Sequence, residues 1–328
     1  MDRMEILQLA GGHRAACVLG AAAELDLFSA LADEALSAGQ LAQRLTTDLR
    51  ATTVLADALA ALGLLDKQGS CYQTPAALRP WLVADSPDSL LPMLLHQMNL
   101  VRTWSQLAPV VQTGQPARRE ASIRGAEADR AAFLGAMHSI SAPVADALVA
   151  RLGPPRFRHL LDVGGASGTW TLAFLRAVSG SRATIFDLAD AIPQARARIT
   201  QAGMLDRVAL AAGDFYHDDL PGGADLVWLS AIVHQHSREH NRALFKKILA
   251  ALTPGGRLLI RDVVMEPDRV QPVEGALFAV NMLVNTDSGG TFTLAEFAED
   301  LAAAGFCPPQ LLIRDAAMNS VVEARKPG

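Results

Sequence analysis

The chain has 328 residues, half of them hydrophobic, and is long enough for two ordinary domains with well-formed cores. Its formal net charge of -5 argues against a general polyanion-binding protein, because affinity for nucleic acids depends largely on Lys and Arg neutralising phosphates. The three cysteines are far apart and form no C-x-x-C pair, so they suggest neither a zinc site nor a disulfide framework.

The first residues carry no basic stretch followed by an apolar run, and no uninterrupted apolar segment of membrane-spanning length is evident. We therefore expect a cytoplasmic protein with no metal and with neither a membrane nor nucleic acid as partner.

Residues 1–100 are expected to form a small, mainly helical domain. Apolar residues recur at three- and four-residue spacing over 15–31, 37–45 and 52–62, which is typical of helices. A polar turn over 66–70 precedes residues 71–74, a pattern that predicts a short hairpin. Three helices followed by a hairpin predict a winged helix.

Winged helices often bind DNA, but the charge of this one favours another role. Residues 1–100 hold six Lys and Arg against eleven Asp and Glu, and the candidate recognition helix 52–62 carries Asp57 and no basic residue. The alanine-rich stretch 15–23 would instead allow two helices to approach closely across a two-fold axis. We expect a homodimerisation domain.

The middle of the chain, 101–153, is expected to be a helical bridge that also caps the substrate. Helical patterns cover 90–104 and 130–152, and a polar stretch over 114–129 joins them. The boundary to the last domain, 154–328, is placed at Gly153-Pro154-Pro155, because paired prolines cannot continue a helix.

The last domain is predicted to be an α/β domain with a Rossmann-like, doubly wound and mostly parallel sheet. Apolar runs rich in β-branched residues alternate with helical patterns, as such a sheet requires. The expected strands are 159–163, 183–187, 208–210, 225–229, 257–264 and 310–314.

A glycine-rich turn at the end of the first of these strands is the strongest functional signal. Gly164, Gly165 and Gly168 let the backbone turn sharply and approach a ligand closely. Their G-G-x-x-G spacing differs from the dinucleotide pattern G-x-G-x-x-G, and Asp162 precedes them. A carboxylate here would repel a pyrophosphate and suits a cationic ligand such as S-adenosylmethionine, which carries an ammonium and a sulfonium.

Two further acids follow the next two strands. Asp187 ends the second strand, beside Leu188, and lies where an acid accepts ribose hydroxyls. In Gly213-Asp214-Phe215, after the third strand, the carboxylate could bind an adenine amino group while the aromatic ring packs on the base. Each acid alone could be a cap or turn residue, but three such elements in order predict a cofactor site.

With these motifs the sequence resembles the class I methyltransferases of the plant-type small-molecule O-methyltransferase group, which have an N-terminal dimerisation winged helix. The resemblance covers nearly the whole chain and is carried by residues 25–28, 41–42, 59–65, 162–168, 213–215 and 252–257. It implies S-adenosylmethionine as methyl donor and a hydroxylated small molecule as acceptor.

The resemblance also implies the catalytic residues. His234 matches the family histidine that acts as general base, and Asp262 matches the carboxylate that orients it. His236 stands where the family has tryptophan. A second base and a substrate contact are open interpretations of it, and a polar loop residue is the favoured one. Ser230 replaces a common lysine in the cofactor site. Gly289-Gly290 is not followed by the glutamate that many members have there.

Substrate contacts are expected from two helices, with Met137 and His138 on one and Asn281, Met282 and Asn285 on the other. Methionines could sandwich a flat ring, although ordinary core packing is an equal explanation for Met137. Methyl transfer to another acceptor atom on the same scaffold stays open, and so do two alternatives to methylation. One is hydroxylation or pericyclic chemistry on the same scaffold, and the other is a cofactor-sensing DNA-binding regulator.

Overall fold

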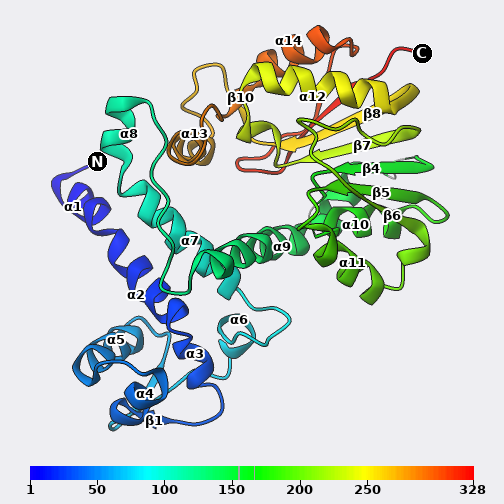
Figure 1. Ribbon diagram of the computed structural model, residues 1–328. Coiled ribbons are helices and arrows are strands. Elements are labelled where there is room, and N and C mark those ends of the chain that lie inside the picture. Colours follow the sequence, from blue (N-terminus) through cyan, green and yellow to red (C-terminus); the bar gives the residue numbers. More distant parts are fainter. Residues whose placement is uncertain (154–155, 166) are drawn as a thin grey trace. The chain divides into compact units, whose positions relative to one another are not determined.

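The computed structural model describes residues 1–153, 156–165 and 167–328 (Figure 1). The chain divides into two compact units, Met1–Arg102 with Arg119–Ile140 and Thr103–Arg118 with Ser141–Gly328. We call them the N-terminal unit and the catalytic unit. Helix α9 (Ala126–Arg151) contributes to both, so the expected bridge 101–153 is divided between them. Pro154 and Pro155 of the expected boundary lie outside the described residues.

The N-terminal unit is mainly helical, as predicted. Its elements before α9 are α1 (Arg3–Gly11), α2 (His13–Glu24), α3 (Leu27–Ala30), β1 (Leu36–Ser37), α4 (Ala38–Leu45), α5 (Leu49–Ala61), β2 (Asp66–Gln68), β3 (Cys71–Gln73), α6 (Arg79–Leu82) and most of α7 (Leu91–Trp104). The three short strands form an antiparallel sheet in the order β1-β3-β2, so the expected hairpin is present with a further strand beside it.

The prediction of one continuous helix over 15–31 is wrong. The chain breaks after α2 because Asp26 takes a left-handed backbone conformation with φ of 53°, which a right-handed helix cannot contain. The Asp26 carboxylate accepts a hydrogen bond of 2.6 Å from Ser29 Oγ in the first turn of α3. The break turns Leu27 and Phe28 into the core of this unit, where both are fully buried.

The catalytic unit contains a seven-stranded sheet in the order β11-β12-β8-β7-β4-β5-β6. The strands are β4 (His159–Val163), β5 (Arg182–Asp187), β6 (Val208–Ala212), β7 (Ala224–Ser230), β8 (Leu252–Asp262), β11 (Gln310–Ile313) and β12 (Ser320–Arg325). Five strands are parallel, while β11 and β12 are antiparallel to their neighbours. The predicted doubly wound α/β fold is confirmed, and β12 is the strand that the sequence pattern did not reveal.

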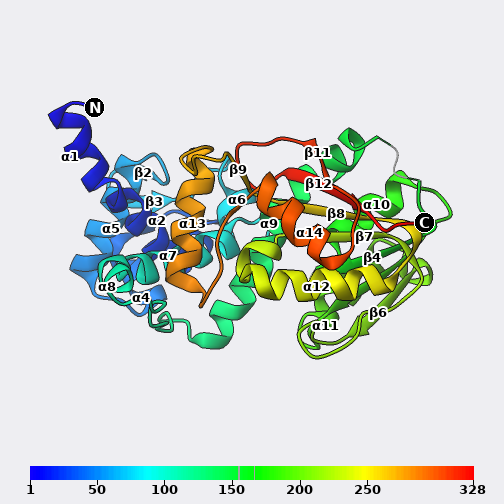
Figure 2. The ribbon, with the colours of Figure 1, turned by 90° about the horizontal axis from the view of Figure 1, so that it is seen from above.

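Helices cover both faces of this sheet (Figures 1 and 2). The end of α9, α10 (Thr169–Ala177) and α11 (Ile192–Gln201) pack on one face, around the buried Phe174 and Trp228. The other face carries α12 (Arg238–Ala251) and α14 (Leu294–Ala304), packed around Phe245 and Phe297. The remaining elements are α8 (Leu107–Thr113), η1 (Leu205–Arg207), η2 (Val233–Gln235), α13 (Val273–Asn285), and the parallel pair β9 (Val264–Met265) and β10 (Phe292–Thr293).

Helix α9 is long and apolar enough to cross a membrane by length and composition. Polar residues interrupt it, so it does not stand out in the sequence as an uninterrupted apolar run. A core helix of a soluble protein passes the same test, and Ala145, Leu148 and Val149 of α9 are buried in the core of the catalytic unit.

Candidate cofactor and catalytic site

The glycine-rich turn follows β4 and packs closely against neighbouring side chains. Gly164 has φ of +69°, and an added Cβ would lie 2.6 Å from Cδ1 of Ile232. A Cβ on Gly165 would lie 2.9 Å from Cγ of Asp162, and Gly168 begins α10 with φ of +73°. Larger residues would therefore clash or be strained, so the turn depends on its glycines. Ala166 lies outside the described residues.

Asp162 is a buried acid directly beneath this turn, with 1% of its surface exposed. Its Oδ2 accepts a hydrogen bond of 2.6 Å from Thr171 Oγ1 on α10. Burial raises the pKa of Asp162 to about 7; the hydrogen bonds from Thr171 act against this rise, and the charge of Asp187 contributes to it. A carboxylate that is costly to ionise without a counter-charge suits a ligand that brings an ammonium.

The predicted ribose site lies at the carboxyl ends of β5 and β6. Asp187 is half-buried, and its Oδ1 accepts a hydrogen bond of 2.7 Å from the N–H of Leu188. The N–H of Gly213 donates to the carbonyl of Asp187 at 2.9 Å, which ties the two strand ends together. A Cβ on Gly213 would lie 2.6 Å from the ring of Phe186, so glycine is needed for this approach.

The segment after β6 is a tight turn. Asp214 accepts a hydrogen bond of 2.9 Å at Oδ1 from the N–H of Tyr216, and Lys247 Nζ donates to the carbonyl of Phe215 at 2.8 Å. These bonds fix the half-buried ring of Phe215 beside the acid. The three predicted elements, namely the glycine turn, Asp187 and the Asp214 turn, follow the parallel neighbours β4, β5 and β6 in that order. Their residues fit an adenosine whose amino-acid end carries an ammonium.

His234 and Asp262 form a hydrogen-bonded pair, as the resemblance implied. Nδ1 of His234 lies 2.9 Å and 3.0 Å from the two carboxylate oxygens of Asp262. The Asp262 carboxylate also accepts from the backbone N–H groups of His234, at 3.3 Å, and of Val263, at 2.8 Å. Because the carboxylate accepts at Nδ1–H, the neutral ring keeps Nε2 free of a proton. The ring packs edge-on against Phe278 of α13, with ring centroids 4.8 Å apart.

The Gly289-Gly290 pair has a structural role that the sequence did not reveal. The N–H of Gly290 donates to the carbonyl of His234 at 2.8 Å, and a Cβ on Gly289 would lie 2.5 Å from that same oxygen. Only a glycine allows this approach, so the pair positions the loop that carries His234.

The interpretation of His236 as a polar loop residue is wrong, because its side chain is buried. Its ring contacts Phe215 edge-on at 5.6 Å, and its Nδ1 is hydrogen-bonded to the hydroxyl of Tyr216. Burial lowers the pKa of His236 to about 4, assisted by the nearby His234 and His240. His236 is therefore neutral at physiological pH and belongs to the packing around Phe215.

The residues proposed for substrate binding lie in different units. Met137 and His138 are on α9 in the N-terminal unit, and both are partly buried. Met282 is buried on α13 in the catalytic unit. On the same helix, Asn281 Oδ1 accepts from Nε1 of Trp104 at 2.9 Å and from Nδ2 of Asn285 at 3.0 Å. That these two groups share one pocket stays a prediction.

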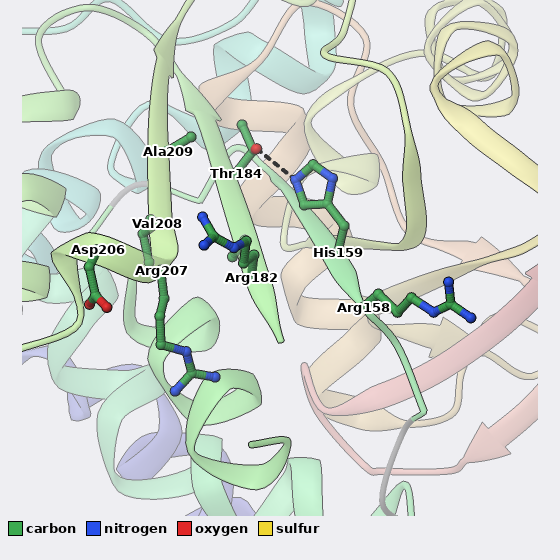
Figure 3. A pocket seen from close by; sticks show the side chains of 9 residues that line it. Arg158, His159, Arg182, Thr184, Asp206, Arg207, Val208 and Ala209 are labelled. Carbon is green, nitrogen blue, oxygen red and sulfur yellow. Dashed lines mark hydrogen bonds between the residues drawn. The ribbon is translucent and has the colours of Figure 1, made fainter. Parts of the chain in front are cut away.

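A hollow of about 530 Å³ lies at the opposite edge of the sheet (Figure 3). It is lined by the residues that begin β4, β5 and β6, including His159 and Arg182, and His159 Nε2 is 2.8 Å from Thr184 Oγ1. Ligands of open α/β sheets bind at the carboxyl ends of the strands, where the glycine turn and the His234–Asp262 pair are found. The hollow is therefore separate from the candidate site.

Comparison with known proteins gives consistent matches along the chain. An O-methyltransferase dimerisation domain matches residues 7–79, and an O-methyltransferase domain matches residues 106–307. The chain is 33% identical to the tetracenomycin polyketide synthesis 8-O-methyl transferase TcmO of Streptomyces glaucescens, over 92% of this chain and 91% of the relative. It is 32% identical to the 3-hydroxy-5-methyl-1-naphthoate 3-O-methyltransferase of Streptomyces sahachiroi, over 92% and 88%.

Among solved structures, the chain matches human N-acetylserotonin methyltransferase in complex with S-adenosylmethionine. The TM-score is 0.84 at 25% identity, and the match covers 100% of this chain and 99% of the human protein.

Proposed function

Because this chain belongs to the O-methyltransferase family and is an S-adenosylmethionine-dependent methyltransferase of small molecules, we propose that it methylates a phenolic hydroxyl with His234 as general base. The observation that carries the proposal is the buried His234–Asp262 pair at the carboxyl edge of the sheet. The two bacterial relatives are named for a polyketide and a hydroxynaphthoate, which supports a flat, hydroxylated acceptor.

We assign the cofactor to the carboxyl ends of β4, β5 and β6. Asp162 would face its ammonium, Asp187 its ribose hydroxyls, and Asp214 with Phe215 its adenine. The bound cofactor supplies a methyl group on a sulfonium, ready for displacement in line with an acceptor oxygen.

His234 has one unprotonated ring nitrogen, Nε2, available for a hydroxyl proton. As that proton arrives, the imidazole becomes a cation, and the Asp262 carboxylate at 2.9 Å stabilises the charge, since both side chains are almost fully buried. Asp262 in turn is held by the N–H of Val263, so it keeps its orientation while the charge develops.

We also propose that the protein is a homodimer formed through its N-terminal unit, with the winged-helix arrangement and cytoplasmic location expected from the sequence. The match to a dimerisation domain over residues 7–79 supports the dimer.

The test is to incubate the protein with methyl-labelled S-adenosylmethionine and a panel of hydroxylated naphthoates and anthraquinones. We expect label in an ether product and release of S-adenosylhomocysteine. A product with altered mass but no label would instead support hydroxylation or pericyclic chemistry. Binding of random duplex DNA at low salt, without methyl transfer to any compound of the panel, would favour the regulator alternative.

A further inference from the structure

Arg261 is a buried cation at the carboxyl end of β8. Only 3% of its surface is exposed, although it directly precedes Asp262, the carboxylate proposed to orient His234. Because side chains alternate along a strand, Arg261 and Asp262 lie on opposite faces of the sheet. Arg261 faces α10, on the side of its register partner Ser230 in β7.

The contacts of the Arg261 guanidinium are all neutral. Nε and Nη2 donate to Asn319 Oδ1 at 2.9 Å and 2.8 Å, and Nη1 donates to Ser230 Oγ at 3.0 Å. The group also lies over the ring of Trp170, 4.6 Å from its centroid. Within the described part of the chain, Arg261 takes part in none of the ion pairs shorter than 4.0 Å.

The charge nevertheless persists at neutral pH. Burial lowers the pKa of Arg261 to about 10, while the more distant Asp262 and Asp315 raise it. A buried guanidinium without a carboxylate in contact is costly, because the protein replaces only part of its hydration. An arginine has five N–H donors, and the three hydrogen bonds to Asn319 and Ser230 use three of them.

A buried acid, Asp162, lies on the same face of the sheet as Arg261 and also faces α10. Asp162 is in register with Trp228 of β7, and Trp228 is two residues before Ser230, so Asp162 and Arg261 both point toward α10. Consecutive residues of α10 contact them, because Trp170 stacks on Arg261 and Thr171 donates to Asp162. These helix residues directly follow the glycine turn. One buried negative and one buried positive group therefore flank the start of α10.

We propose that Arg261 binds the α-carboxylate of the methionine half of the cofactor, opposite Asp162 and its ammonium. The inference rests on the proposed placement of the cofactor in the glycine turn. A zwitterionic amino-acid end matches the two buried charges, and the free N–H donors of a guanidinium suit carboxylate oxygens. Ser230 and Asn319 then act as positioning residues that orient the guanidinium.

The test compares two ligands by calorimetry. S-adenosylhomocysteine has the amino-acid end, whereas 5′-methylthioadenosine lacks it and keeps the adenosine. Arg261→Gln should weaken S-adenosylhomocysteine roughly ten- to hundred-fold, as expected on removing one member of a buried charge pair, and leave 5′-methylthioadenosine within about two-fold. Arg257→Gln, on the same face at the other end of β8, is the matched control and should leave the ratio of the two affinities unchanged.

If Arg261→Gln weakens the binding of both ligands equally, or of neither, the proposal is overturned and Arg261 is a packing residue. If that variant does not fold, Arg261→Lys serves, since it keeps the charge and loses the planar donor group. This variant should lose less affinity, and only for S-adenosylhomocysteine. If its two affinities stand in the same ratio as in the wild-type protein, the proposal is equally overturned. Failure of the wild-type protein to bind S-adenosylhomocysteine at all would instead refute the proposed cofactor placement.

Discussion

Replacement of His234 by alanine tests the proposed mechanism most directly. The change removes the only imidazole that contacts Asp262 within hydrogen-bonding distance in the described residues. The Asp262 carboxylate keeps two backbone donors, from residue 234 itself and from Val263, so it is not left without partners.

The expected loss of stability is therefore moderate. Loss of one hydrogen bond to a charged group costs ~2 kcal/mol, which in a unit of this size lowers Tm by about 4 to 8 °C. The rate of methyl transfer should fall much more, by ~10² to 10⁴, because a positioned general base usually contributes that factor. Affinity for S-adenosylhomocysteine should hardly change, since His234 lies on η2 after β7 and outside the glycine turn.

The assay follows methyl transfer at saturating S-adenosylmethionine with an acceptor found in the panel described above. His240→Ala is the matched control, because His240 is exposed on α12 and its ring is hydrogen-bonded to the hydroxyl of Ser237 at the start of that helix. A His234→Ala variant that is folded, binds cofactor and keeps most of the wild-type rate would refute the general-base role. The site would then act by positioning alone.

Three further predictions concern the cofactor and the assembly. Asp187→Ala should weaken the binding of S-adenosylhomocysteine at least ten-fold by calorimetry, since hydrogen bonds from hydroxyls to a charged acceptor contribute ~1.5 to 3 kcal/mol. An unchanged affinity would remove Asp187 from the site. Because burial raises the pKa of Asp162 to about 7, this carboxyl is mostly protonated at pH 6 and mostly ionised at pH 8. The affinity for the cofactor should therefore rise over this range. Asp162→Asn should abolish that rise, and an identical pH profile in the variant would exclude Asp162 as its source. Light scattering should report about twice the chain mass of 34.8 kDa, whereas a monomer at all concentrations would contradict the dimer.

Sequence patterns were sufficient for six of the seven strands of the sheet and for the order of its motifs. The glycine turn, Asp187 and Asp214 each follow a short apolar run, and in a parallel sheet such positions come to the same edge. This local pattern sufficed because each element is fixed by residues close to it in the chain. Strand β12 escaped prediction because Glu323 interrupts its apolar residues, and only the fold shows that this acid is buried beside Arg257.

The tertiary structure decided what depends on residues far apart in the chain. The pairing of His234 with Asp262 was expected only from the resemblance, and the structure supplies its geometry across 28 residues. The burial of His236, and the placement of Arg261 against Ser230, have no periodic or spacing signal at all. Whether a polar side chain is solvated or buried depends on which elements pack against it, and that follows from the sheet order and the helices on each face rather than from neighbouring residues.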